Sequence, residues 1–216
     1  GPAPPLWVRG SPPSGRDRPP LTIWAVSAAG AGIEAQALGL AEAVGRLRPA
    51  DIAVKRIRWR WGLGRLPAWM NPAPRRALAN PAAIAPPWPD IWIATGRATL
   101  PLSTRIRRWS AGRTFVVQTQ DPRTDLAPFD LVIPPAHDGL EGPNVFAIIG
   151  APNRLTPERL AVALARFRAR IDALPRPRLA LIVGGALGAH NLSHAPAPEG
   201  AGAGAGAGGG PGGLGA

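Results

Sequence analysis

Three side chains of this 216-residue chain have the chemistry of a general base and lie beside turns. Asp121 falls in QTQDPR (118–123), and His137 and Asp138 fall together in PPAHDGLEGPN (134–144). A histidine or carboxylate placed at a turn after a buried strand can take a proton from a substrate, so these three are the candidate catalytic residues. Two alternatives remain open. Turn formation would by itself explain Asp121, which precedes a proline, and a single histidine is more often a structural hydrogen-bonding group.

Arginine and amide side chains stand at the same turns and could hold an anionic ligand. Arg97 follows the apolar run IWIAT in ATGRATLP, and its planar guanidinium can bind a phosphate or a carboxylate through two hydrogen bonds. Pairing of Arg97 with Asp90 or Asp121 is the alternative. The candidate ligand-binding residues are Gly30, Gly32, Gln36, Gly96, Arg97, Gln120, Arg123 and Asn144.

The first turn of the chain contains a weak nucleotide-binding signal. Gly30, Gly32 and Ala35 match the spacing G-x-G-x-x-A of dinucleotide-binding loops. Such loops are followed about twenty residues later by an acid that binds a ribose hydroxyl. Here Arg56 and Arg58 stand instead, so an NADP site with arginine on the extra phosphate is one alternative. We expect no bound cofactor.

Other catalytic classes have little support. His190 and His194 have the i, i+4 spacing of a helical metal pair, but AHNLSH lacks the glutamate of the zinc proteases, so no metal site is expected. The absence of cysteine excludes disulfides, thiolate metal sites and a cysteine nucleophile. No serine lies in a G-x-S-x-G motif, which leaves a serine hydrolase unsupported.

Short apolar runs alternate with helical periodicities, and these elements must position the candidate residues. The predicted strands are 21–27, 52–57, 90–94, 114–118 and 129–133. Apolar residues at helical spacing predict helices over 33–48 and 98–109, and the pair Thr156-Pro157 opens a third. This alternation predicts the α/β class with a Rossmann-like, doubly wound parallel sheet. Ligands of such sheets bind beyond the carboxyl ends of the strands.

Composition divides the chain into segments. Seven prolines among residues 1–20 predict a disordered leader, and ten glycines after residue 199 predict a Gly/Ala-rich, low-complexity tail over 196–216. Between them we expect a Rossmann-like domain over 21–176. Residues 177–195 are expected to be the start of a second such domain, opened by a strand over 179–185.

The formal net charge of +12 favours anionic partners. Lys55 is the one lysine, and arginine-rich composition of this kind is typical of a GC-rich bacterial genome, so no nucleic-acid partner is expected. No apolar run approaches the roughly 18 residues of a membrane span. We expect a cytoplasmic protein, with peripheral contact to the inner membrane as an option. The alternative function is a non-catalytic module that docks a protein partner or an anionic membrane surface through the basic, Trp-bearing segment 55–61.

Five ordered blocks resemble the bacterial branch of the mitochondrial fission Elm-type family. They are EAQALGLAEAV, PDIWIATGRATLP, TFVVQTQDPR, FDLVIPPAHDGLEGPNV and IIGAPNRLTPERL, within residues 21–194. The resemblance implies the N-terminal half of a fold like that of the GT-B glycosyltransferases, in which two Rossmann-like domains face a cleft. It also implies a nucleotide sugar or another phosphate-bearing ligand and, in an active relative, glycosyltransferase-like or nucleotide-sugar-processing chemistry.

Two departures from the family pattern modify these expectations. The family's first loop usually reads D-G-R-x-G where this chain has AAGAG (28–32), so the match to a dinucleotide loop is expected to be accidental. In GT-B folds the second domain carries most contacts to the donor nucleotide, and the resemblance ends at the first strand of that domain. We therefore expect a chain truncated after its first domain that binds a ligand without transferring sugar.

Overall fold

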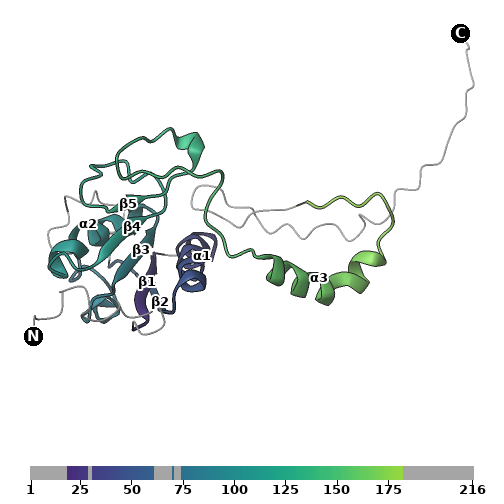
Figure 1. Cartoon of the computed structure of the whole chain (residues 1–216), viewed down its shortest axis with the longest axis horizontal. Helices are drawn as coiled ribbons and strands as arrows, with labels where there is room; N and C mark the ends of the chain where they lie inside the picture. Colours follow the sequence, from purple (N-terminus) through teal and green to yellow (C-terminus); the bar gives the residue numbers. More distant parts are fainter. Residues whose placement is uncertain (1–18, 29–30, 61–69, 71–73, 182–216) are drawn as a thin grey trace, which may run out of the picture. The chain divides into compact units, whose positions relative to one another are not determined.

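One parallel sheet organises the described part of the chain. A computed structural model describes residues 19–28, 31–60, 70 and 74–181. The strands are β1 (Leu21–Ser27), β2 (Ala50–Arg56), β3 (Ile91–Thr95), β4 (Phe115–Gln118) and β5 (Leu131–Val132) (Figure 1). They lie in the order β2-β1-β3-β4-β5, and every neighbouring pair is parallel. The predicted α/β class with a doubly wound parallel sheet is confirmed.

The two crossover helices lie on opposite faces of the sheet. α1 (Ala31–Leu47) connects β1 to β2, and α2 (Leu100–Trp109) connects β3 to β4 (Figure 1). Parallel crossovers are almost always right-handed, so connections that step across the sheet in opposite directions leave their helices on opposite faces. The reversal between β1 and β3 is the topological switch point, where doubly wound sheets bind their ligands.

The sheet is buried on both faces, which explains why its strands read as continuous apolar runs. Successive side chains of β1 point to opposite faces, so Ile23 and Ala25 pack on the α1 side while Trp24 and Val26 pack on the α2 side. The α1-side core also contains Ala37, Ala41, Ile93, Val117 and Ile133. The α2-side core also contains Ile57, Leu78, Ile84, Trp92, Leu102, Ile106, Val116 and Val132.

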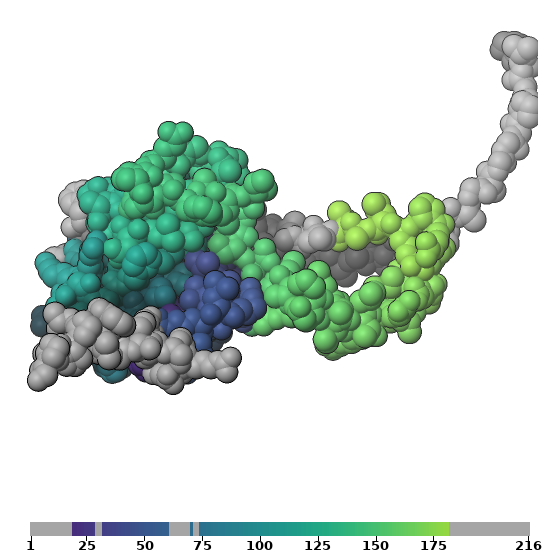
Figure 2. Space-filling model, viewed as in Figure 1, coloured from purple at the N-terminus to yellow at the C-terminus, as the bar shows by residue number. Residues whose placement is uncertain are grey.

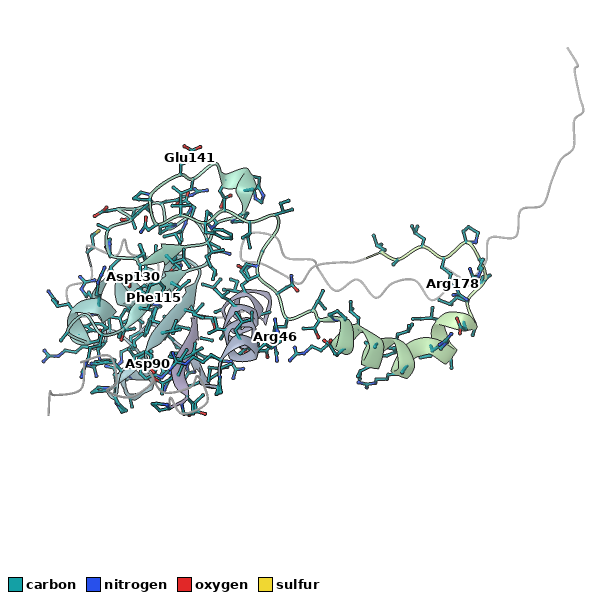
Figure 3. The ribbon with its side chains drawn as sticks, viewed as in Figure 1. Arg46, Asp90, Phe115, Asp130, Glu141 and Arg178 are labelled. Atoms are coloured by element: carbon teal, nitrogen blue, oxygen red, sulfur yellow. The ribbon has the colours of Figure 1, made fainter. Side chains whose placement is uncertain are left out.

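The amino ends of the central strands are fixed by carboxylates. Asp90 accepts hydrogen bonds from the amide and the hydroxyl of Thr22, at 2.8 and 2.9 Å, and thereby joins β3 to β1. Asp130 accepts one from the amide of Val116 at 2.8 Å and pairs with Arg107 at 3.1 Å. In Figure 3, Asp90, Phe115 and Asp130 follow one another across the sheet. The strand β5 is shorter than the predicted strand 129–133.

The later elements agree only in part with the predictions. The third helix, α3 (Pro157–Asp172), begins at the predicted Thr156-Pro157 pair, and the Thr156 hydroxyl accepts a hydrogen bond from the Arg159 amide at 3.3 Å. Residues 179–181 form no regular element, and the rest of the predicted strand 179–185 lies outside the described residues. The leader, the tail and the domain boundaries stay predictions. In the described part of the chain, none of the helices combines the length and the apolar character needed to span a bilayer.

Candidate functional site

The carboxyl ends of four strands converge on the first two turns of α1. β1 leads into α1 through the chain itself. At the end of β2, Arg56 pairs with Glu34, with Nη2 and Oε1 2.8 Å apart. After β4, Gln120 donates a hydrogen bond to Gln36 at 3.3 Å. Gln36 and Gln120, both predicted ligand-binding residues, are therefore brought together across 84 residues of sequence.

The fourth connection is the turn after β3. Gly96 has φ +86°, a backbone conformation that side chains other than glycine rarely adopt. A Cβ built on Gly96 would lie 3.6 Å from Cγ2 of Ile33, so this turn lies against the first turn of α1. The Thr99 hydroxyl donates to the Gly96 carbonyl at 2.7 Å and closes the 3-10 turn Arg97–Thr99. Gly96, one of the predicted ligand-binding residues, is therefore required at this turn for its backbone conformation.

A row of buried hydroxyls lies at this edge, on the face of the sheet that α1 covers. Ser27 and Thr95 are register partners at the ends of β1 and β3. The hydroxyls of Thr95 and Thr119 are 2.6 Å apart. Ser27 Oγ is buried and has no hydrogen-bond partner among the described residues. A buried hydroxyl left unpaired costs on the order of 1–3 kcal/mol, and this one lies next to the switch point.

Ser27 and Thr119 are not among the site residues predicted from the sequence. Both are polar residues that end an apolar strand, and this signal was present in LTIWAVS and TFVVQT. Their spatial relation could not be read from it, because the strand order decides which strand ends are neighbours.

The start of α1 is an electrostatically favourable place for an anion. Helix N-termini carry a partial positive charge and unpaired amides. The Arg56 hydrogen bond lowers the pKa of Glu34, against a smaller opposing effect of burial, and the guanidinium offsets the charge of this carboxylate. Since Arg56 is held by Glu34, the structure disfavours the alternative in which Arg56 binds the extra phosphate of NADP.

Arg97 is exposed, and its side chain forms no hydrogen bond or ion pair with any described residue. The alternative in which it pairs with Asp90 or Asp121 is wrong. Asp90 binds Thr22 at the opposite end of the strands, and Asp121 accepts a hydrogen bond from the Arg123 amide at 2.7 Å. The guanidinium of Arg97 is therefore available beside the turn after β3.

Asp121 and Arg123 form a tight turn after β4. The hydrogen bond from the Arg123 amide occupies Oδ1 of Asp121, and Arg123 has a positive φ of 49°. Local hydrogen bonding of this kind is what lets an aspartate direct a turn. Turn formation, which was an alternative role for Asp121, is confirmed, and it leaves the other carboxylate oxygen without a partner among the described residues.

His137 and Asp138 lie after β5 in the 3-10 turn Ala136–Asp138. Nε2 of His137 and Oδ1 of Asp138 are 3.5 Å apart, and the His137 side chain is 79% exposed. No hydrogen bond or ion pair links them to α1 or to Asp121 in the part of the chain that the structure describes. They share the carboxyl edge of the sheet with the other candidates without touching them.

The remaining candidates have other surroundings. Asn144 donates hydrogen bonds to the carbonyls of Leu126 and Phe129, at 3.0 and 2.8 Å, so its amide ties together the loops on either side of β5. Gly32 is exposed in the first turn of α1, and a Cβ there would meet nothing within 4 Å. Gly30, His190 and His194 lie outside the described residues. The described residues contain no group of three His, Cys, Asp or Glu side chains arranged for a metal ion.

The basic segment 55–61 uses several of its side chains inside the fold. Lys55 Nζ lies 4.3 Å from the centre of the Trp24 ring, and Arg56 pairs with Glu34. The Trp59 indole donates to the Ala98 carbonyl at 3.0 Å. Arg58 and Arg60 are exposed, and Trp61 lies outside the described residues. The segment therefore offers fewer free groups to a partner than its sequence indicates.

The middle of α1 is joined to the segment that precedes α3. Glu42 accepts hydrogen bonds from Nε and Nη2 of Arg154, at 3.0 and 2.6 Å, and from Arg159 at 3.2 Å. The Arg154 hydrogen bond lowers the pKa of Glu42 below its ordinary value of 4.5, against the opposing effect of partial burial.

This lowered pKa predicts a pH-dependent contribution to stability. The carboxylate is stabilised in the folded state, so its contribution is complete above the ordinary pKa of 4.5 and is lost as the pH falls through the folded-state pKa. Because both groups are partly exposed, we expect about 1 kcal/mol or less. Glu42→Gln should lower the urea midpoint, followed by circular dichroism, at neutral pH and leave it nearly unchanged in strong acid. An equal loss at both pH values would contradict this assignment.

Comparison with known proteins agrees with the resemblance found in the sequence. A family model described as Mitochondrial fission ELM1 matches residues 31–201, more than three quarters of the chain. Over 50 residues the chain is 50% identical to the mitochondrial fission protein ELM1 of Arabidopsis thaliana. This stretch is 23% of the chain and covers 12% of the plant protein. No solved structure matches. The chain belongs to the mitochondrial fission ELM1 family.

Proposed function

We propose that this chain binds a phosphate-bearing small molecule of the nucleotide-sugar class at the carboxyl edge of its sheet. The observation that carries the proposal is the buried hydroxyl of Ser27 at the switch point, beside the start of α1, which has no hydrogen-bond partner among the described residues. A phosphate oxygen placed there would accept a hydrogen bond from Ser27 Oγ and lie in the favourable field of the helix N-terminus.

Arg97 supplies the charge that this site requires. It is exposed at the neighbouring turn, which Gly96 brings against Ile33 of α1. A guanidinium bound to phosphate through two hydrogen bonds contributes about 1.5–3 kcal/mol. Gln36 and Gln120 add an amide pair at the same place, suited to the hydroxyl groups of a sugar.

If the bound molecule reacts, Asp121 is the preferred base. Its free carboxylate oxygen follows β4, next to Gln120, whereas His137 and Asp138 follow β5 and contact none of these groups. Asp121 is therefore our proposed proton acceptor, and Arg97 the group that orients the phosphate.

The test uses the full chain with UDP-glucose, GDP-mannose and free UDP in thermal-shift and titration experiments. At least one probe should raise the melting temperature in a concentration-dependent manner. Arg97→Ala should weaken its binding by about ten- to hundredfold. Arg46→Ala is the matched control, because Arg46 lies in the last turn of α1, at the opposite end of that helix from this edge, and the binding of this variant should stay within about twofold of wild type.

Ser27→Ala separates ligand binding from folding. Removing a buried hydroxyl that has no partner should leave the unliganded melting temperature unchanged or raise it, because an unpaired buried polar group is lost. The same substitution should reduce the ligand-induced shift. A variant that lowers the unliganded stability and binds the probe normally would assign Ser27 to the core and remove the main support for this site.

A further inference from the structure

A cavity of about 540 Å³ lies on the α2 side of the molecule. It is formed by segment 74–81 and by the outward-facing side of α2. The residues that line it are Arg60, Pro74, Arg75, Arg76, Pro81, Arg105, Arg108 and Trp109. None of them belongs to the site at the carboxyl edge of the sheet. Five of the eight are arginines, and no acidic residue is among them.

The wall of the cavity is built from fixed groups. Arg75 donates to the Ile84 carbonyl at 2.7 Å, and its guanidinium lies 5.3 Å from the Trp88 ring and 5.8 Å from the Trp109 ring. Trp88 and Trp109 are stacked, with ring centroids 5.9 Å apart. The Arg60 amide donates to the Ala77 carbonyl at 2.9 Å, which holds the two sides of the loop together. These contacts hold this wall of the cavity in place without a ligand.

Basic residues far outnumber acidic residues in this region of the chain. Between Asp51 and Asp121 the chain contains twelve basic residues and one acid, Asp90. Asp90 is bound to Thr22 at the sheet. By contrast, Arg107, the neighbour of Arg108 in sequence, is paired with Asp130 at 3.1 Å.

The arginines of the cavity also influence one another. Arg60, Arg76 and Arg108 are exposed and have no carboxylate partner among the described residues. Burial and the charge of Arg108 lower the pKa of Arg105. Like charges gathered in one concave site repel one another, and an anion that enters the site relieves this repulsion.

We propose that the cavity binds a small organic molecule that carries two or more phosphate groups. Its volume lies within the range of roughly 300–1,000 Å³ typical of small-molecule sites. Guanidinium groups match phosphate oxygens in geometry, and the exposed guanidinium groups of Arg60, Arg76 and Arg108 supply more N–H donors than a single phosphate can use. The concave shape favours a compact ligand over a duplex nucleic acid or a flat membrane surface. The same chemistry occurs free in solution and on lipid headgroups, and the proposal is for the free molecule.

The test measures binding of inorganic pyrophosphate and of ATP to the full chain by isothermal titration. The variant is Arg76→Ala/Arg108→Ala. Both side chains are exposed and have no partner among the described residues, so the circular dichroism spectrum and urea midpoint of the variant should match those of wild type. We expect saturable binding of one molecule, weaker binding of inorganic phosphate, and a loss of at least about tenfold in the variant.

Arg46→Ala is the control, because Arg46 is an exposed arginine on α1, on the other side of the sheet (Figure 3). It should bind within about twofold of wild type. An equal loss in Arg46→Ala would show that the binding is non-specific attraction to net charge, and unchanged affinity in the double variant would show that the ligand binds outside the cavity. Either result would overturn the proposal. Ser27→Ala should keep its affinity for pyrophosphate, which distinguishes this site from the one at the carboxyl edge.

A vesicle experiment distinguishes the two sources of phosphate. Wild type and the double variant are sedimented with vesicles of phosphatidylcholine containing phosphatidylglycerol. Loss of sedimentation in the double variant, combined with no measurable binding of pyrophosphate or ATP, would assign the cavity to a membrane surface and refute the proposal. Saturable binding of pyrophosphate to the wild-type chain, measured without vesicles, supports the proposal.

Discussion

Trp92→Ala is expected to destabilise the fold by about 3–5 kcal/mol, the usual cost of removing a large buried aromatic side chain. Trp92 is fully buried in the middle of β3 and packs in the α2-side core, with its ring centroid 6.1 Å from that of Trp24. Domains of this size are typically stable by about 5–15 kcal/mol, so the variant should lose a large fraction of its stability. Urea unfolding followed by far-UV circular dichroism measures the effect.

The polar end of Trp92 gives a control for this prediction. Its indole N–H donates to the hydroxyl of Ser103 in α2 at 3.0 Å, and both residues are buried. Ser103→Ala would leave the indole N–H unpaired and should cost about 1–3 kcal/mol. In Trp92→Phe/Ser103→Ala neither partner remains, so the double variant should be more stable than the sum of the single effects implies. Strict additivity would show that the hydrogen bond contributes nothing.

Gly39→Ala is expected to destabilise the protein by about 1–3 kcal/mol, although alanine is the better helix former. Gly39 is buried in α1, where a Cβ would lie 2.3 Å from the carbonyl oxygen of Asn153 and 2.5 Å from its carbonyl carbon. Figure 2 shows the green segment near residue 150 lying against the dark-blue surface of α1. Backbone cannot yield as a flexible side chain does, so this segment must move away from the helix.

Gly45→Ala, in the same helix, should change the stability in the opposite direction. A Cβ at Gly45 would lie 3.5 Å from Cδ1 of Ile52, an ordinary contact, so helix propensity decides and stability should rise by up to about 1 kcal/mol. Thermal and urea unfolding of the two variants side by side check the contrast. If both substitutions raised stability, the close approach of Asn153 to α1 would be contradicted.

The two predicted sites also have different relations to the fold. At the carboxyl edge, charge and hydroxyls come from several strand ends and meet at α1, as the topology of a doubly wound sheet requires. The arginine-lined cavity depends on no such rule, because segment 74–81 and α2 meet where the Arg75 guanidinium lies over the stacked rings of Trp88 and Trp109. Only the site at the carboxyl edge could be expected from the fold class.

The sequence by itself determined the order and type of the elements. LTIWAVS predicted β1 with its observed bounds, and the spacing of apolar residues over 33–48 predicted α1 to within about two residues. These patterns are local, since burial on one face imposes a period of two or 3.6 along the chain itself. The sequence also placed Arg97, Asp121 and His137 correctly after the ends of strands, because turns follow strands along the chain.

Only the tertiary structure decided which of these side chains are free. Whether Arg97 pairs with an acid, whether Arg56 is held by Glu34, and whether Gln36 meets Gln120 depend on contacts between residues far apart in sequence. The same holds for Ser27, which is left without a partner by the strands and helix around it. A side chain is available for a ligand when packing leaves it unpaired, and packing is a property of strand order and helix placement that no local pattern encodes.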